Sequence, residues 1–410
     1  MKRVVVTGMG AVTPIGIGVD SFWTSVRAGK HGFAEITQFD TSEAKVKIAA
    51  EVQDFDSSVA IEPKEAKRMA RFTQLGMVAA AEAMEDSGII GNVDAEKMGV
   101  IVGAGIGGIN VYEEETVKTY DGRANRVSPF MVPMMIPNIL AGQIAIKYGA
   151  KAVCTCPVTA CATGTNAIGD AFLAIKRGEC DVVIAGGAES TITPVTFAGF
   201  ANMTALSMKN HPDSSSTPFD KDRDGFVMGE GAGIFIMEDL EHALARGAKI
   251  HAELVGYGTT CDAHHITAPS PDGNGAARSM QMAIDDAGIA ASDISYINAH
   301  GTGTPANDFC ETLSIKTVLG KHAYKVPINS TKSMIGHLLG GAGAVEAIVC
   351  VKSLQDGFVH QTLGFKTKDE ELDLDYSHDG GREMELEYAL SNSLGFGGHN
   401  ATLILKKFST

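Results

Sequence analysis

The feature that most constrains the fold is a repetition within the 410-residue chain. Residues 83–89 read Ala-Met-Glu-Asp-Ser-Gly-Ile, and residues 283–289 read Ala-Ile-Asp-Asp-Ala-Gly-Ile. Near the end of each half, residues 231–237 resemble residues 398–405. Because several matches occur in the same order, they predict two related halves, residues 1–250 and residues 251–410.

Strand and helix patterns alternate along the chain. Three apolar runs that end at a glycine are predicted strands: residues 3–7 before Gly8, residues 99–103 and residues 181–187. Helical patterns lie between such runs, for example at residues 79–87 and 167–177. Continuous apolar strands suit a sheet that is covered on both faces, so the pattern predicts an α/β fold with mixed, buried sheets. The polar segment 208–230 is a predicted long loop.

The charge balance narrows the choice of partners. With 44% hydrophobic residues, 20% charged residues and a net charge of −15, the chain has the composition of a globular enzyme. A negative field argues against nucleic acid or an anionic membrane as the main partner. The one clearly basic cluster, residues 63–72, fits either a solvated helix face or a dock for an acidic carrier.

We expect a cytoplasmic protein. The apolar run at residues 4–6 is too short for a secretory signal, and no stretch reaches the roughly 20 apolar residues of a membrane span. Seven cysteines without a secretory signal indicate reduced thiols.

Cys161 and two distant histidines provide the chemistry. Cys161 lies among small residues before a helical pattern, which predicts a thiol at a helix N-terminus, where the helix dipole favours thiolate. A lone cysteine is usually a small buried hydrophobe. His300 and His337, each beside glycines after an apolar run, favour catalysis instead, by acyl transfer through a thioester.

Four other motifs have a less specific interpretation. Cys154 and Cys156 lack a second pair at zinc-like spacing. Residues 220–225 match the start of a calcium loop, but Gly231 occupies its twelfth position. Residues 8–13 suggest a dinucleotide loop without its third glycine, so we expect a glycine-rich turn. Phe396, between glycines, suits a gate or a plain turn.

Four motifs together resemble one family over essentially the whole chain. The cysteine motif, His-Gly-Thr-x-Thr-Pro at 300–305, Lys-Ser-x-x-Gly-His at 332–337 and Gly-Phe-Gly-Gly at 395–398 are similar to those of the elongating β-ketoacyl-acyl carrier protein synthases, most closely the synthase II class. The resemblance implies a thiolase-like fold with a duplicated five-layer αβαβα core, a homodimer and an acyl carrier protein as partner. It implies no cofactor of the chain's own, because the carrier brings the phosphopantetheine.

The resemblance also implies a role for each site residue. Cys161 would hold the acyl chain, while His300 and His337 would stabilise the enolate formed when malonyl-carrier protein loses CO2. Backbone N–H groups of Cys161 and Phe396 would bind a second oxyanion, and Phe396 would also gate the acyl pocket. Lys332 would assist by its positive charge, and Glu311 would help to order the site. Thr302 and Thr304 would bind the pantetheine arm, and Ile106 would line the acyl pocket. The carrier dock would comprise Lys64, Lys67, Arg68 and Lys209. A monovalent cation site would comprise Asn298, Ala299, Glu346, Ser391 and Asn392.

Other functions stay open at this point. A ketosynthase of a polyketide or specialised pathway would use the same chemistry with another carrier. A non-catalytic dimeric partner subunit disagrees with the intact Cys161, His300 and His337, and a metal-binding regulator would depend only on the incomplete loop at 220–225. The chain also departs from many relatives at Gly303 and His399, which leaves the three catalytic positions untouched.

Overall fold

Two sets of five strands form the centre of the molecule. The computed structural model describes residues 1–409, and its main sheet runs in the order β11-β10-β14-β15-β9-β1-β8-β7-β5-β6, with β2 paired to β1. The first set comprises β1 (Val4–Thr13), β5 (Met98–Gly103), β6 (Cys154–Thr155), β7 (Val182–Glu189) and β8 (Gly231–Asp239). The second set comprises β9 (Ala252–Cys261), β10 (Ile294–Asn298), β11 (Ile328–Asn329), β14 (Tyr388–Gly395) and β15 (His399–Lys406).

The second set repeats the first in strand order. The order β6-β5-β7-β8-β1 corresponds to β11-β10-β14-β15-β9, and the two sets meet where Val4–Val6 pair antiparallel with residues 252–254. The repeated segments of the sequence fall at equivalent places, since β8 and β15 are equivalent strands. The repeated segments 83–89 and 283–289 each contain the end of a helix, which is followed by a left-handed glycine, Gly88 or Gly288. The predicted duplicated α/β core is therefore confirmed.

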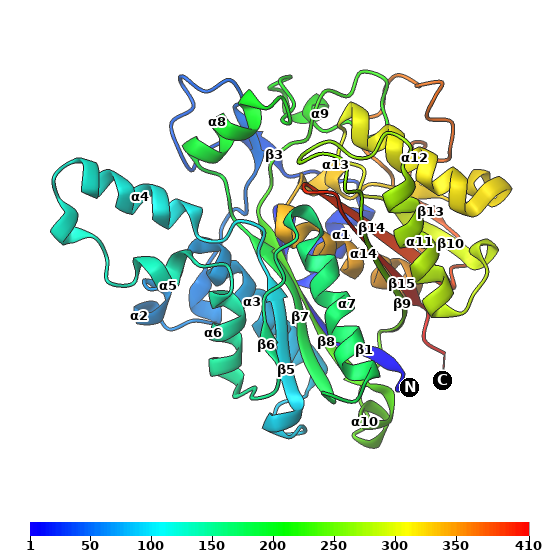
Figure 1. The fold of residues 1–410 in the computed structure, drawn as a ribbon, viewed down its shortest axis with the longest axis horizontal. Helices are drawn as coiled ribbons and strands as arrows, with labels where there is room; N and C mark the ends of the chain where they lie inside the picture. Colours follow the sequence, from blue (N-terminus) through cyan, green and yellow to red (C-terminus); the bar gives the residue numbers. More distant parts are fainter. Residues whose placement is uncertain (410) are drawn as a thin grey trace.

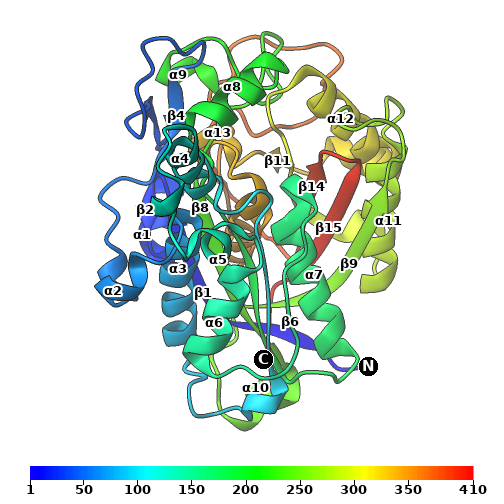
Figure 2. The ribbon, with the colours of Figure 1, turned by 60° about the vertical axis from the view of Figure 1, so that its left-hand side comes forward.

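Helices complete five layers around these strands. The helices α3 (Arg71–Ser87) and α6 (Ile139–Tyr148) cover the outer face of the first set, and α11 (Asn274–Ala287) covers that of the second. Between the sets lie α7 (Thr163–Lys176) and α14 (Ala342–Asp356), which contact strands of both. Figure 2 shows α3 at the left and α11 at the right, with the sheet and α7 between them. The elements of both halves meet along the middle of Figure 1, which makes a seam between them.

The remaining elements are shorter or more peripheral. The helices are α1 (Val19–Arg27), α2 (Pro63–Ala66), α4 (Ile109–Tyr120), α5 (Met131–Met135), α8 (Pro194–Asn202), α9 (Pro212–Ser215), α10 (Leu240–Ala245), α12 (Pro305–Leu319) and α13 (Lys332–Ile335). The small strands are β2 (Gly16–Ile17), β3 (Phe33–Glu35), β4 (Ile48–Ala50), β12 (Phe358–Val359) and β13 (Arg382–Glu383). Within the predicted loop at 208–230, the only helix is the single turn α9. No helix in residues 1–409 is long and apolar enough to cross a membrane.

One local prediction is wrong. Residues 8–13 form no turn but continue the buried strand β1, whose pairing with β8 shifts register between Val6 and Gly8. The glycines serve packing, because a Cβ atom on Gly10 would lie 1.9 Å from the carbonyl oxygen of Ala79 in α3. A Cβ atom on Gly8 would lie 2.3 Å from the carbonyl oxygen of Ala83. The strand and the helix can approach this closely only where the strand carries no side chain.

Candidate active site

Cys161 lies at the start of α7, in a short 3-10 turn formed by residues 160–162. The turn begins with a left-handed Ala160, whose φ is 50°. A non-glycine residue in this conformation is strained, and such strain is held where the surrounding structure fixes it. As a whole residue Cys161 is 7% exposed, and it belongs to an apolar cluster with Phe197, Phe226 and Leu339.

A cavity of about 670 Å³ at the seam brings the predicted residues together. The first half contributes Cys161, together with Phe200 of α8 and Phe226. The second half contributes His300, Thr302, Thr304, His337, Leu339 and Phe396. The thiol and both imidazoles therefore share one cavity although more than 130 positions separate Cys161 from His300 in the sequence.

His300 and His337 form a pair of neutral hydrogen-bond donors. Their ring centroids are 5.2 Å apart and nearly perpendicular, at 82°. Lys332 donates to Nδ1 of His300 across 3.3 Å, and the backbone N–H of Leu339 donates to Nδ1 of His337 across 3.2 Å. With Nδ1 occupied as an acceptor, each neutral ring carries its proton on Nε2. Burial, assisted by the charge of Lys332, holds the pKa of both histidines well below the usual value.

Lys332 places a positive charge next to the imidazole rings of His300 and His337. It begins α13, is 1% exposed, and pairs with the buried carboxylate of Glu346 across 2.5 Å. A buried ammonium needs a partner of this kind, because an isolated charge away from water is strongly destabilising. The pair thus keeps a cation close to the histidines and to Cys161, whose pKa its charge lowers.

The predicted position of Cys161 at the N-terminus of a helix is confirmed, but burial of the thiol works against its ionisation there. Burial raises the pKa of Cys161 to about 11, and the charge of Glu189 raises it further. Lys332 and the backbone N–H groups of Phe396 and Cys161 favour the thiolate, but they do not offset the loss of hydration. The sequence could not reveal this result because it depends on how completely distant segments cover the sulfur.

Glu311 fixes the backbone that carries His300. Its buried carboxylate on α12 accepts hydrogen bonds from the N–H groups of His300 and Gly301, each at 2.8 Å. Asn392 adds a third bond at 3.2 Å. Burial raises the pKa of Glu311 to about 7 against the effect of these donors. The residue orders the site, and it does not line the cavity.

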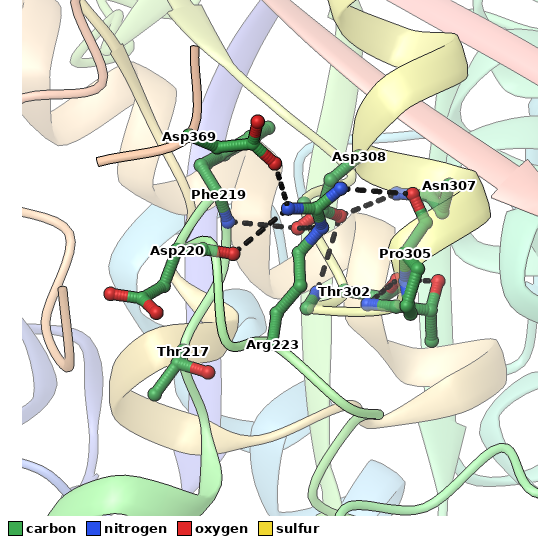
Figure 3. A network of polar contacts seen from close by, with 12 residues as sticks. Thr217, Phe219, Asp220, Arg223, Thr302, Pro305, Asn307, Asp308 and Asp369 are labelled. Carbon is green, nitrogen blue, oxygen red and sulfur yellow. Dashed lines mark hydrogen bonds and ion pairs between the residues drawn. The ribbon is translucent and has the colours of Figure 1, made fainter. Parts of the chain in front are cut away.

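A polar network shapes the neighbouring loop that carries Thr302 and Thr304 (Figure 3). Asp308 accepts from the N–H groups of Phe219 at 2.8 Å and Gly303 at 3.2 Å. Arg223 lies against it, donates to Asp369 at 2.8 Å and also bonds backbone carbonyl groups. The hydroxyls of Thr302 and Thr304 are 2.9 Å apart and both line the cavity. Residues of the acidic run 220–225 thus form hydrogen bonds and ion pairs with other residues of the same chain.

Phe396 occupies the hairpin turn between β14 and β15. Gly397 and Gly398 have φ values of 87° and 77°, which glycine adopts without strain. Gly395 packs on the nucleophile, since a Cβ atom there would lie 3.2 Å from the nitrogen of Cys161. The ring of Phe396 lines the cavity with its centroid 6.4 Å from that of Phe200. The segment is therefore a turn that also forms part of the cavity wall.

Three buried oxygens beside the catalytic pair lack hydrogen-bond partners within residues 1–409. They belong to Asn298 on β10, Ser391 on β14 and Glu346 on α14. Asn298 and Ser391 are paired across neighbouring strands, and Cys350 lies close to both Ser391 and Glu346. Oxygen donors of this kind suit a hard cation. Ala299 follows directly in the chain, whereas the amide of Asn392 already bonds Glu311 and Thr402.

The outer residues of the predicted site are placed differently. Lys64, Lys67 and Arg68 are exposed around α2, as a docking surface requires. Lys209 is not free, because its ammonium donates to the carbonyl oxygen of Asp222 at 2.7 Å and to Thr217 at 3.2 Å. Ile106 does not line the open cavity but packs against the apolar cluster that contains Cys161.

Two further groups escaped the sequence analysis. Glu189, at the end of a predicted buried strand, is a buried carboxylate close to the site, and Arg223 with Asp308 supports the threonine loop. The sequence does contain one signal for Glu189, which is a charged residue at the end of an apolar strand. Such residues are seldom buried without a partner. Arg223 and Asp308 are 85 positions apart, so nothing local in the sequence connects them.

Comparisons with known proteins agree with this geometry. The family models described as "Beta-ketoacyl synthase, N-terminal domain" and "Beta-ketoacyl synthase, C-terminal domain" match residues 1–243 and 251–366. The 3-oxoacyl-[acyl-carrier-protein] synthase 2 of Synechocystis sp. is 51% identical, over 99% of this chain and 98% of that protein. The protein of the same name from Staphylococcus aureus is 49% identical, over 99% of both chains. A solved type II PKS ketosynthase, in complex with its acyl-carrier protein and bound to the hexaketide, has a TM-score of 0.92 at 34% identity with full coverage of both chains.

Proposed function

The chain belongs to the β-ketoacyl synthase family, and we propose that it condenses malonyl-acyl carrier protein with an acyl chain held on Cys161, as an elongating enzyme of type II fatty-acid synthesis. It is an acyltransferase of the 3-oxoacyl-acyl carrier protein synthase 2 type. The observation that carries the proposed chemistry is the seam cavity shared by Cys161, His300 and His337.

In the first step, the sulfur of Cys161 attacks the thioester of the acyl-carrier protein. The acyl carbon forms a bond to the cysteine sulfur and its bond to the pantetheine sulfur breaks. The proton of the cysteine thiol ends on the released pantetheine sulfur. The backbone N–H groups of Cys161 and Phe396, which favour negative charge on the sulfur, would bind the oxyanion of this step.

In the second step, malonyl-carrier protein enters and loses CO2. The bond between the carboxylate carbon and the methylene carbon breaks, and its electron pair passes into an enolate. The Nε2–H groups of His300 and His337 stabilise the enolate oxygen, because both rings are neutral donors in a buried site. Lys332 adds a fixed positive charge.

In the third step, the enolate carbon attacks the acyl-enzyme. A carbon–carbon bond forms and the bond from the acyl carbon to sulfur breaks. The sulfur of Cys161 leaves as thiolate and takes up one proton from solvent. The product is a 3-oxoacyl chain two carbons longer on the carrier. Thr302 and Thr304, which line the cavity on a loop fixed by a polar network, bind the pantetheine arm.

A monovalent cation fits the unpartnered oxygens of Asn298, Glu346 and Ser391, with Ala299 as a backbone contributor. The amide of Asn392 is occupied, so we assign it to positioning Glu311. A bound cation would supply positive charge near Glu346 and no bond-making chemistry. The reaction needs no other cofactor, since the carrier brings its own phosphopantetheine.

The partner of the enzyme is an acyl carrier protein docked on Lys64, Lys67 and Arg68, all exposed and basic in an acidic chain. A second copy of the chain pairs with the exposed edge strand β6, because an open sheet edge leaves backbone groups unpaired. All seven cysteines are free thiols, which fits the reducing cytoplasm.

The fatty-acid pathway is favoured over a polyketide pathway by degree of similarity. The fatty-acid synthases are 49–51% identical to this chain, whereas the type II PKS ketosynthase is 34% identical. The intact Cys161, His300 and His337 disagree with a non-catalytic partner subunit.

The test is a condensation assay with purified acyl-carrier and malonyl-carrier proteins. Wild-type protein is expected to form the 3-oxoacyl product with release of CO2. The Cys161→Ala variant should form no condensation product. A wild-type protein that forms no product with any acyl chain would contradict the proposed function.

A further inference from the structure

Glu189 is a buried carboxylate that the proposed reaction steps do not use. It ends β7 and is fully buried. Its partners are four backbone N–H groups, those of Gly105 at 2.6 Å, Ile106 at 3.2 Å, Gly107 at 3.0 Å and Gly340 at 3.1 Å. Burial raises the pKa of Glu189 to about 7, and the same four N–H groups act in the opposite direction.

These donors come from two segments on opposite sides of the seam. The turn at residues 105–107 follows β5 in the first half and carries Ile106. Gly340 belongs to the second half and follows Leu339 directly. Ile106 and Leu339 both pack in the apolar cluster that contains Cys161. One carboxylate therefore connects two segments whose side chains, Ile106 and Leu339, pack in the apolar cluster beside the nucleophile.

The backbone around Leu339 depends on this connection. Leu339 has a φ of 45°, a strained conformation for a large side chain. Hydrogen bonds hold it on both sides: its own N–H bonds Nδ1 of His337 at 3.2 Å, and the N–H of Gly340 bonds Glu189 at 3.1 Å. Loss of the second bond would release a residue that lines the cavity beside His337.

The close approach of the segments also requires small residues. A Cβ atom on Gly105 would lie 2.7 Å from Oε2 of Glu189, and a Cβ atom on Gly340 would lie 2.8 Å from it. The glycines thus permit direct contact between backbone and carboxylate, as in other anion-binding nests.

We propose that Glu189 is a positioning residue of the acyl pocket: its carboxylate fixes Ile106 and Leu339 beside Cys161 and thereby sets the length of acyl chain that the thiol accepts. This inference rests on the proposed function. Glu189 touches no substrate and acts through the two apolar side chains.

The experiment measures transfer of a short and a long acyl chain, each on the same carrier protein, to Cys161 by mass spectrometry. Wild type, Glu189→Gln, Ile106→Ala and the double variant are compared. Glu189→Gln keeps the shape but replaces one acceptor oxygen with a donor. We expect the ratio of long-chain to short-chain rates to shift about tenfold, the size expected from losing one hydrogen bond to a charged group. In the double variant the two shifts should add incompletely, because Glu189 acts in part through Ile106.

Glu238→Gln is the matched control. Glu238 is also fully buried, and it lies at the opposite end of the paired strands β7 and β8, next to Val182. It should lower the melting temperature and leave the chain-length ratio unchanged. If Glu189→Gln does not fold, Glu189→Asp retains the charge with a shorter reach and is measured in the same way.

A ratio within about twofold of wild type in a folded Glu189 variant would overturn the inference, as would simple additivity with Ile106→Ala. A wild-type enzyme that accepts neither chain would instead contradict the proposed function, so the two failures are distinguishable.

Discussion

At the scale of single residues, the chemistry of Cys161 is set by its surroundings. The same thiol would be partly ionised near neutral pH on a helix N-terminus open to water. Here burial raises its pKa to about 11, while Lys332 and two backbone N–H groups act in the opposite direction. Burial therefore favours the neutral thiol over the thiolate in the free enzyme.

Alkylation of Cys161 should report this pKa. A thiol that ionises near 11 reacts as thiolate in a proportion that rises roughly tenfold per pH unit below that value. We expect the iodoacetamide rate of Cys161, followed by peptide mass spectrometry, to rise continuously from pH 7 to pH 10. A rate that levels off by pH 8 would show that the thiol is not desolvated in this way.

Replacing either histidine should slow decarboxylation of malonyl-carrier protein. Loss of one donor to a developing oxyanion typically lowers the rate by about 10²–10³-fold, so we expect this loss for His300→Ala and for His337→Ala. Because both pKa values lie well below the usual histidine value, the wild-type rate should not fall as the pH decreases through about 6.5.

The readout is CO2 release, with His31→Ala, a change at a surface pair with Asp213, as the control. Decarboxylation rates near that of wild type in both active-site variants would contradict the proposed role of His300 and His337 as hydrogen-bond donors. A half-maximal loss near pH 6.5 would indicate that the rings titrate in contact with water.

Residue identity alone indicated most of the site. Cys161, His300, His337 and Phe396 stand in local motifs that require no knowledge of the fold. Glu189 was not found because its partners are backbone N–H groups, which no sequence pattern displays. Lys209 was assigned to the docking surface by its charge, yet its ammonium bonds residues of its own loop.

At the scale of helices and strands, close packing explains the glycines of β1. Gly10 lies so near α3 that any side chain would displace the helix or the strand. Overpacking of a tightly packed core typically destabilises a protein by about 1–3 kcal/mol.

Gly10→Ala should therefore lower the free energy of unfolding by at least about 1–3 kcal/mol, measured by chemical denaturation. Gly142→Ala is the matched control, because Gly142 lies within α6 with open space around its Cα atom. That change should stabilise the protein slightly, since alanine favours helix over glycine by about 1 kcal/mol. Equal stability of the two variants would contradict the packing account.

The elements themselves were largely predictable. The apolar runs at 99–103 and 181–187 became β5 and β7, and the helical pattern at 79–87 became the end of α3. The error at residues 8–13 arose because glycine has two uses. It permits turns, and it also permits close contact with an element 70 residues away, which only the assembled structure reveals.

At the scale of the whole molecule, the proposed contact with the carrier depends on three exposed basic residues of an acidic chain. Changing Lys64, Lys67 and Arg68 together to glutamate should raise KM for the acyl-carrier protein about tenfold or more and leave kcat nearly unchanged. The wild-type KM should rise with salt, because screening weakens attraction between exposed charges.

The control changes the exposed Lys30, Lys321 and Lys325 to glutamate, which alters the net charge equally at other positions. If both triple variants weaken binding to the same extent, net charge rather than a local dock governs the encounter.

The duplication places the nucleophile and the two histidines in different halves, so the site exists only when both halves pack along the seam. The most direct test is intact-protein mass spectrometry after incubation with an acyl-carrier protein. We predict one acyl mass per chain, located on the peptide that contains Cys161 and missing in Cys161→Ala. An unmodified protein, or an acyl group on any other residue, would contradict the account.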